Sequence, residues 1–142
     1  MDSGTLEVVN RTFECVQKSD LDALMALFAD DAVVIDPHFP MSPMHGRAAI
    51  AKGFAQAMKR TRSFGYSRMN YFESADHSSA AVETGTHHIL HDGTALKFQQ
   101  MFVFDVQNER IRRMQAYEPY GPHGKVGWFL LLARLREKLL RR

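Results

Sequence analysis

The sequence predicts one α+β domain, with helices packed on one face of a curved sheet, followed by a separate C-terminal helix. Two patterns support this class. Apolar residues are spaced three and four apart over most of the first 60 residues, as in helices, and alternate with polar residues from about residue 66 to 120, as in strands. Helices followed by a run of strands are typical of α+β folds. The 142 residues suffice for one domain with a modest core.

Apolar spacing predicts three helices in the first part of the chain. The first carries Leu6, Val9, Phe13 and Val16 on one face, and the second carries Leu21, Leu24, Met25 and Phe28. Ser19 or Asp20 suits the N-cap of the second helix. The Ala-rich residues 46–60 predict a third helix, with Ile50, Phe54, Ala57 and Met58 on its inner face.

Strands are predicted between and after these helices. The β-branched run AVVID, residues 32–36, predicts a strand that Pro37 closes, and residues 37–46 hold three of the five prolines and therefore predict a loop. Strand-length segments follow at residues 66–74, 79–91, 94–105 and 110–120. The HDG sequence at residues 91–93 is the clearest hairpin signal among their connections.

Alternation also predicts which side chains point inward. In residues 96–104 the even positions are the apolar set, and Gln100 is their one polar member. A buried amide without a partner costs about 1–3 kcal/mol, so Gln100 needs a neighbour, a water or a ligand. We expect the neighbouring strands to add two inward faces, namely Glu83, Gly85, His87 and Ile89, and Met114, Ala116 and Glu118.

Three stretches of the chain carry a family resemblance. FADDAVVIDP (residues 28–37), MHGRAAIAKGF (44–54) and RIRRMQAYEP (110–119), with the strands between them, resemble the SnoaL-like polyketide cyclase and ketosteroid isomerase group of the nuclear transport factor 2-like superfamily. The resemblance covers about residues 5–120 and implies a cone-shaped barrel of curved, mostly antiparallel sheet wrapped around the N-terminal helices. It implies acid/base chemistry without a cofactor (isomerisation, cyclisation or epoxide and water chemistry) or, alternatively, small-ligand binding without catalysis, because one fold hosts both.

The resemblance also assigns residues. The general base of the isomerase branch falls on Asp36. The oxyanion-hole Tyr of that branch falls on Thr12, which is too short to replace a phenol, and its oxyanion Asp falls on Gln100, whose amide can still donate a hydrogen bond. Spacing alone allows a second interpretation of Asp36, as the residue that opens a turn before Pro37.

We expect a cavity that combines these groups. The candidate catalytic residues are Asp36, Gln100, His87 and Glu118, and the candidate substrate contacts are Thr12, Phe54, Met58, Glu83, Phe102 and Met114. His87 and Glu118 would form an acid/base pair, although a strand register shifted by one residue would replace them with His88 and Tyr117. Tyr66 and Tyr117 are assigned to sheet or interface contacts.

Charge and composition limit the partners. Residues 125–142 carry six Lys or Arg side chains against Glu137, whereas the preceding residues carry 12 basic and 15 acidic side chains, so the predicted domain offers no basic nucleic-acid groove. The spacing of His87, His88 and His91 matches no standard ligand pattern, and we expect neither a metal nor a cofactor. The ligand should be a small apolar molecule. A homodimer is expected through the outer sheet face at Met101, Val103 and Tyr117.

The last segment is predicted to be a basic amphipathic helix. The expected division is residues 1–120 for the domain and 121–142 for this extension, in which Trp128, Leu131, Leu132, Leu135 and Leu139 follow helical spacing. Such a helix can pack on protein, which we favour, or lie on an anionic membrane. The N-terminal residues lack the apolar core of a signal peptide and no apolar run is long enough to span a bilayer, so a cytoplasmic location is expected.

Overall fold

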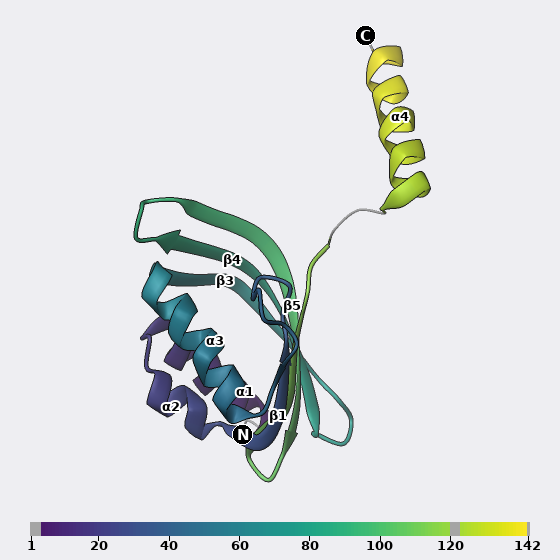
Figure 1. Cartoon of the computed structure of the whole chain (residues 1–142). Coiled ribbons are helices and arrows are strands. Elements are labelled where there is room, and N and C mark those ends of the chain that lie inside the picture. Colours follow the sequence, from purple (N-terminus) through teal and green to yellow (C-terminus); the bar gives the residue numbers. More distant parts are fainter. Residues whose placement is uncertain (1–3, 120–122, 142) are drawn as a thin grey trace.

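The computed structural model describes residues 4–119 and 123–141. Its helices are α1 (Gly4–Gln17), α2 (Leu21–Ala26), α3 (Arg47–Arg60) and α4 (Gly124–Leu140), and its strands are β1 (Phe28–Ile35), β2 (Met44–His45), β3 (Thr61–Glu73), β4 (Ser79–Leu90), β5 (Ala95–Gln107) and β6 (Arg110–Tyr117). Helices α1–α3 lie within the curve of the sheet, and α4 stands apart from them (Figure 1).

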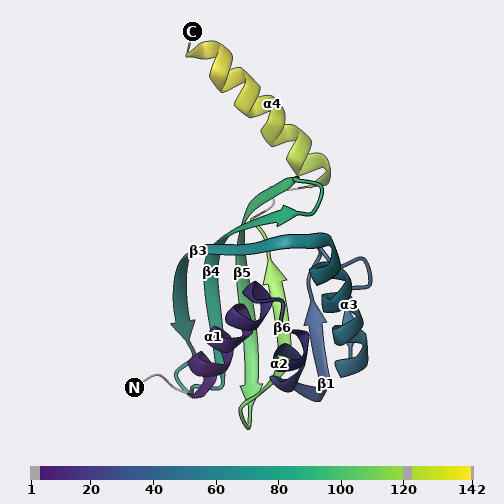
Figure 2. The same cartoon turned by 90° about the vertical axis from the view of Figure 1, so that its left-hand side faces the viewer.

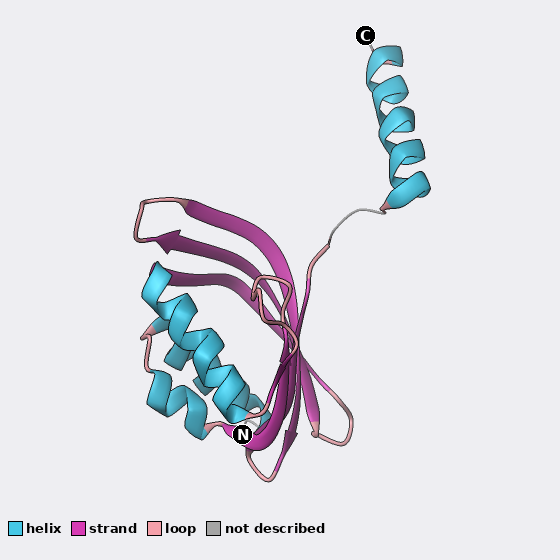
Figure 3. Ribbon diagram, in the orientation of Figure 1, coloured by secondary structure: helices cyan, strands magenta, loops and turns pink. Residues whose placement is uncertain are grey.

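The predicted α+β class is confirmed, but the sheet is open. Its strand order is β2-β1-β6-β5-β4-β3, so β2 and β3 form two free edges and no barrel closes. Neighbouring strands are antiparallel except for β1 and β6, which are parallel. Figure 2 shows the long strands running behind α1 and α2, and Figure 3 shows α1–α3 gathered on one side of the strands, with α4 apart from them. This arrangement places the core between one layer of helices and one face of the sheet.

The beginning of β1 differs from the prediction. Asp20 caps α2 as expected, with its Oδ1 accepting the N–H of Ala23 at 3.0 Å, but the helix ends at Ala26. Phe28 begins β1 and is fully buried, because it pairs with Ile111 of β6 instead of continuing the helical stripe. The register shifts between Phe28 and Val33, where Asp30 and Asp31 are exposed.

The inward face of β4 also differs from the prediction. Its buried side chains are Ala80, Val82, Thr84 and Thr86, whereas Glu83 and His87 are exposed on the outer face. Pairing with β5 fixes this register: Val82 lies opposite Phe102 and Thr84 opposite Gln100, and directly paired residues share a face. The expected inward position of Glu83 and His87 is therefore wrong.

The remaining parts follow the prediction more closely. Gln100, Phe102 and Phe104 are buried, and Met101 and Val103 lie on the opposite, outer face beside Tyr117, where a homodimer remains a prediction. The expected domain boundary at residue 120 lies outside the described residues. Helix α4 buries none of its described side chains, and none of the described helices combines the length and hydropathy of a transmembrane span.

Candidate functional site

The polar part of the site begins where β1 ends. Asp36 follows Ile35 and is only 6 % exposed. Its backbone N–H donates to Ser42 Oγ at 3.0 Å, and its carboxylate Oδ1 accepts the backbone N–H of His38 at 2.9 Å. Its side chain also lines an internal cavity. Asp36 therefore holds the turn through its hydrogen bonds and also lines the cavity, while its role as a general base stays a prediction.

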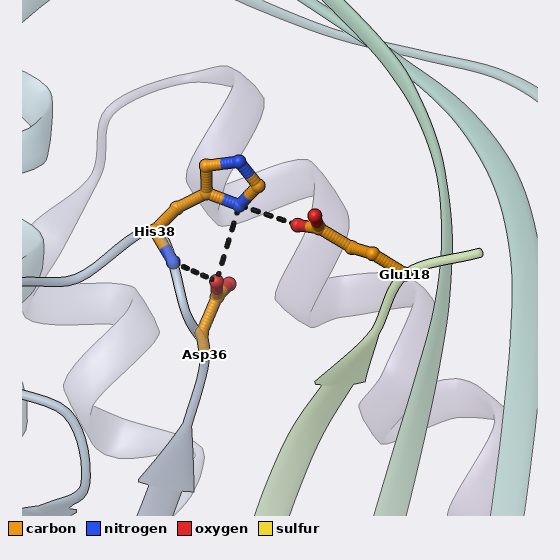
Figure 4. A group of neighbouring side chains, drawn as sticks. All are labelled: Asp36, His38 and Glu118. Carbon is orange, nitrogen blue, oxygen red and sulfur yellow. Dashed lines mark hydrogen bonds and ion pairs between the residues drawn. The ribbon is translucent and has the colours of Figure 1, made fainter. Parts of the chain in front are cut away.

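His38 links Asp36 to a second carboxyl group, that of Glu118, which directly follows β6 (Figure 4). His38 Nδ1 lies 2.5 Å from Glu118 Oε1 and 3.5 Å from Asp36 Oδ1. The side chain of Glu118 is 1 % exposed, whereas that of His38 is 39 % exposed. Because β1 and β6 are parallel neighbours, with Ile35 opposite Gln115, their ends bring residues 36 and 118 together.

Gln100 joins this group from β5. Its Nε2 donates to Glu118 Oε1 at 3.2 Å, and its Oε1 accepts the hydroxyl hydrogen of Thr86 at 2.7 Å. The buried amide thus has the partners that it requires. An amide nitrogen carries two hydrogens, so one N–H beyond the bond to Glu118 is available to a ligand in the cavity, which Gln100 also lines.

Burial raises the pKa values of both carboxyl groups, Asp36 and Glu118. It raises the pKa of Asp36 against the opposing effect of the hydrogen bond from the His38 backbone. It also raises the pKa of Glu118, against the nearby His38 and the hydrogen bond from Gln100, and the negative charge of Asp36 raises it further. Glu118 Oε2 is buried with no hydrogen-bond partner among the described residues. Carboxyl groups of this kind are suited to proton transfer nearer neutral pH.

An apolar cavity of about 200 Å³ adjoins these groups, between the helices and the sheet. The loop after β1 covers part of it: Phe39 packs on Phe54 with ring centres 5.2 Å apart, and the His38 ring stacks on Phe98 at 4.4 Å. Of the residues expected to contact a substrate, four line the cavity, namely Thr12, Phe54, Phe102 and Met114.

Two further polar side chains line the cavity from β3 and β4. Tyr66 and His88 meet edge to face, with ring centres 5.3 Å apart. His88 Nδ1 accepts the backbone N–H of Gly65 at 3.2 Å, so the ring proton is on Nε2. Burial lowers the pKa of His88 to about 4, and burial together with the charge of Asp36 raises the pKa of Tyr66. Both side chains are therefore neutral hydrogen-bond donors at pH 7.

Three expected site residues lie elsewhere. His87 is exposed on the outer face opposite Lys97, so it forms no pair with Glu118. Glu83 accepts a hydrogen bond from Asn70 Nδ2 at 3.3 Å on the same outer face. Met58 is half-buried against the core but does not line the cavity, because Ala57 occupies the facing position on α3.

His38 was not predicted, and Tyr66, which lies in the sheet as expected, was not predicted to line the cavity. His38 sits in a Pro-rich loop with no periodic pattern, and its partner Glu118 is 80 positions later, so only strand pairing could reveal the contact. Tyr66 was assigned to the sheet, but the inward face of β3 could not be derived because its pairing with β4 shifts register between Ser67 and Asn70. His88 was identified only as the alternative to His87.

Among the described residues, the group of His38 with its two carboxyl neighbours could also hold a divalent cation. Asp36, His38 and Glu118 each place one ligand atom within 4.8 Å of the others. Metal–ligand bonds of about 2.0–2.2 Å hold two ligand atoms farther apart than the 2.5 Å between His38 Nδ1 and Glu118 Oε1, so these atoms would have to separate to admit an ion. The arrangement as it stands suits a shared proton better.

The chain is similar to known proteins in sequence and in fold. Residues 9–114 match the family model of the SnoaL-like domain. A putative polyketide cyclase from Xanthomonas campestris pv. campestris is similar, with 19% identity, a TM-score of 0.72, and coverage of 88% of this chain and 93% of that one. A Δ5-3-ketosteroid isomerase from Mycobacterium sp. has 21% identity and a TM-score of 0.72, with 82% and 93% covered. At these identities the similarity of the structures establishes the fold alone.

A third similar structure contains a ligand. It is a Mycobacterium tuberculosis protein in complex with estradiol-17β-hemisuccinate, with 22% identity, a TM-score of 0.71, and coverage of 82% of this chain and 94% of that one.

Proposed function

This chain belongs to the SnoaL-like domain family, and on that premise we propose that it is a small-molecule enzyme that carries out acid/base chemistry on an apolar ligand, with Asp36 as the general base. One observation carries the proposal. Two buried carboxyl groups with raised pKa values are joined through the imidazole of His38, namely Asp36, which lines an apolar cavity, and Glu118, which is not among the residues that line it. Burying such groups is unfavourable for folding alone, which supports a catalytic use.

The reaction that fits these groups is proton transfer at a carbon next to a carbonyl. The Asp36 carboxylate would remove the proton, the C–H electron pair would form a C=C bond as the C=O π pair moves to oxygen, and the neutral Tyr66 and His88 would donate hydrogen bonds to the resulting enolate. In an isomerisation Asp36 would then return the proton at another carbon. In a cyclisation the enolate carbon would instead attack a second carbonyl of the substrate, and the proton would go to that carbonyl oxygen. Gln100 would hold Glu118 in place and offer its second N–H.

His38 and Glu118 would serve as a proton store beside the base. Nδ1 of His38 lies 2.5 Å from Glu118 Oε1 and 3.5 Å from Asp36 Oδ1. In a reaction that leaves the proton on Asp36, His38 would pass that proton to Glu118, and Asp36 would be ionised again. The similar ketosteroid isomerase and polyketide cyclase structures are consistent with this kind of chemistry. The cavity lining favours an apolar substrate.

The alternative is a ligand-binding domain without catalysis. It is favoured by Thr12 and Gln100, which stand where the resemblance gives a Tyr and an Asp. In the binding alternative the polar groups would only orient a ligand.

Asp36→Asn tests the proposal. A panel of apolar unsaturated ketones would be screened for isomerisation by absorbance and for deuterium uptake from D2O by mass spectrometry. We expect Asp36→Asn to lower turnover about 10²–10⁴-fold, and the matched control Asp31→Asn, an exposed carboxyl on β1, to retain it. Ligands that bind the wild-type protein without any turnover or exchange would instead establish the binding alternative.

A further inference from the structure

Helix α4 exposes most of the large apolar surface of the described chain. Eight of the eleven exposed large apolar residues belong to it, with exposures between 49 and 71%, namely Val126, Trp128, Phe129, Leu131, Leu132, Leu135, Leu139 and Leu140. In Figures 1 and 2 the helix stands apart from the sheet and from α1–α3. It also follows the residues matched by the family model, so the family fold does not account for it. Apolar surface of this extent indicates contact with a partner or a membrane.

The apolar and basic side chains of α4 are ordered around its axis. Trp128, Leu131, Leu132, Leu135 and Leu139 follow three- and four-residue spacing and form one stripe, called here the leucine stripe. At about 100° per residue, Arg136 and Lys138 lie along the two edges of this stripe. Long basic side chains at such edges can extend to lipid headgroups while their stems stay on apolar surface.

A second feature separates a membrane from a protein groove as the partner. Residues 126–133 contain no charged side chain, and their apolar side chains point in every direction around the helix. A protein groove that covers one face would leave part of this segment in water, whereas a helix lying in a membrane interface can insert its uncharged part more deeply than its charged part. Residues 125–142 also hold six Lys or Arg against one Glu, a charge that complements anionic headgroups.

We propose that α4 binds the surface of an anionic lipid membrane, with the leucine stripe toward the acyl chains and Arg136 and Lys138 at the headgroups. The helix would lie in the interface and not cross the bilayer, since 17 residues are too few for a typical span. This inference goes beyond the proposed function and does not depend on it. A membrane-bound protein would have apolar ligands close to its cavity.

The single tryptophan makes the proposal directly measurable. Trp128 is the only tryptophan in the chain, so tryptophan fluorescence, excited selectively over the tyrosines, reports on α4 alone. Full-length protein would be mixed with phosphatidylcholine vesicles that contain or lack phosphatidylglycerol. We expect a blue shift of Trp128 emission and co-flotation with the phosphatidylglycerol vesicles, both weakened by added salt.

Matched variants locate the contact. Leu135→Glu, on the leucine stripe, should lower partitioning by roughly tenfold or more, whereas Leu140→Glu, about 120° around the helix from the centre of the stripe, should lower it only through its charge, about fivefold. Arg136→Gln should lower partitioning about fivefold, and the control Arg62→Gln on β3 should not change it. Asp36→Asn should bind vesicles like the wild type, which keeps this test separate from the test of the base.

Three results would overturn the proposal. Absence of partitioning into phosphatidylglycerol vesicles would do so directly. An emission already blue-shifted without vesicles, at every protein concentration, would mean that α4 packs on its own domain. A blue shift that grows with protein concentration would mean that a second copy covers the helix. Circular dichroism of each variant would verify that the domain remains folded.

Discussion

The domain and helix α4 depart from the usual distribution of side chains in opposite directions. The domain buries Asp36, Gln100 and Glu118 beside an apolar cavity, whereas α4 exposes eight large apolar side chains. Apolar groups in general favour the interior and charged groups the surface, so each departure is informative. The difference suggests that the domain is adapted to receive a small molecule and α4 to contact something much larger.

The two regions also differ in what holds them together. In the domain, residues far apart in the chain are paired across the sheet, as with Ile35 opposite Gln115. At the C-terminal end of α4 the ion pair from Arg141 Nε to Glu137 Oε2, at 3.9 Å, is local. Isolated helices of this length are marginally stable in water. We therefore expect the domain to fold cooperatively and α4 to gain stability mainly from its partner.

The largest expected effect comes from deleting the same side chain in each region. Phe104→Ala removes a fully buried ring that packs edge to face on Phe13 at 5.9 Å, and it should cost about 3–5 kcal/mol of unfolding free energy. Phe129→Ala in α4 should change that free energy by less than about 0.5 kcal/mol. Urea denaturation measures both. A comparable loss for Phe129→Ala would show that α4 packs on the domain.

A smaller effect is expected from two neighbouring glutamines. Gln100→Leu removes the hydrogen bonds to Thr86 and Glu118, of which Glu118 keeps its contact with His38, and should cost about 1–3 kcal/mol. Gln99→Leu places the same change on the exposed outer face and should be nearly neutral. Thermal unfolding of the two variants compares them. Equal changes in Tm for the two variants would mean that the hydrogen bonds of Gln100 to Thr86 and Glu118 do not stabilise the fold.

Asp36→Asn should stabilise the protein, by an amount that depends on pH. Burial raises the pKa of Asp36 above its ordinary value of 3.8, so the folded state holds a proton that the unfolded state releases, and stability is lost as pH rises through the raised pKa. The neutral amide avoids this loss and can still accept the His38 N–H. We expect a higher Tm for the variant at pH 7, by about 2–8 °C for each kcal/mol gained, and no difference near pH 3. A lower Tm at pH 7 would indicate that the ionised carboxylate stabilises the fold.

The smallest effect is expected in α4. Glu137→Gln removes an exposed partner of Arg141 and should change the free energy of unfolding by at most about 0.5 kcal/mol. The same denaturation measurement serves here. A larger change would mean that Glu137 has a tertiary contact.

Particular residues show where prediction from sequence succeeded and failed. Asp36 was located because a charge at the end of an apolar strand is conspicuous and matched a family pattern. The inward face of β5 followed from strict alternation, with Gln100, Phe102 and Phe104 buried as expected. The prediction that His87 points inward was wrong because it assumed that the polar positions of β4 face the cavity. The β-branched Val82, Thr84 and Thr86 alternate on the face that is buried instead. Phe28 was assigned to a helix because its spacing fits one.

The family resemblance supplied the candidate base Asp36, and the sequence by itself determined the α+β class, three helices near their observed limits and the separate, basic C-terminal helix. These are properties of periodicity and local charge, which a chain displays without long-range contacts. Only the tertiary structure decided that Glu118 meets His38, that His88 and Tyr66 face the cavity, and that β1 runs parallel to β6. These depend on strand register, and a shift of one residue reverses the face of every side chain without changing the local pattern.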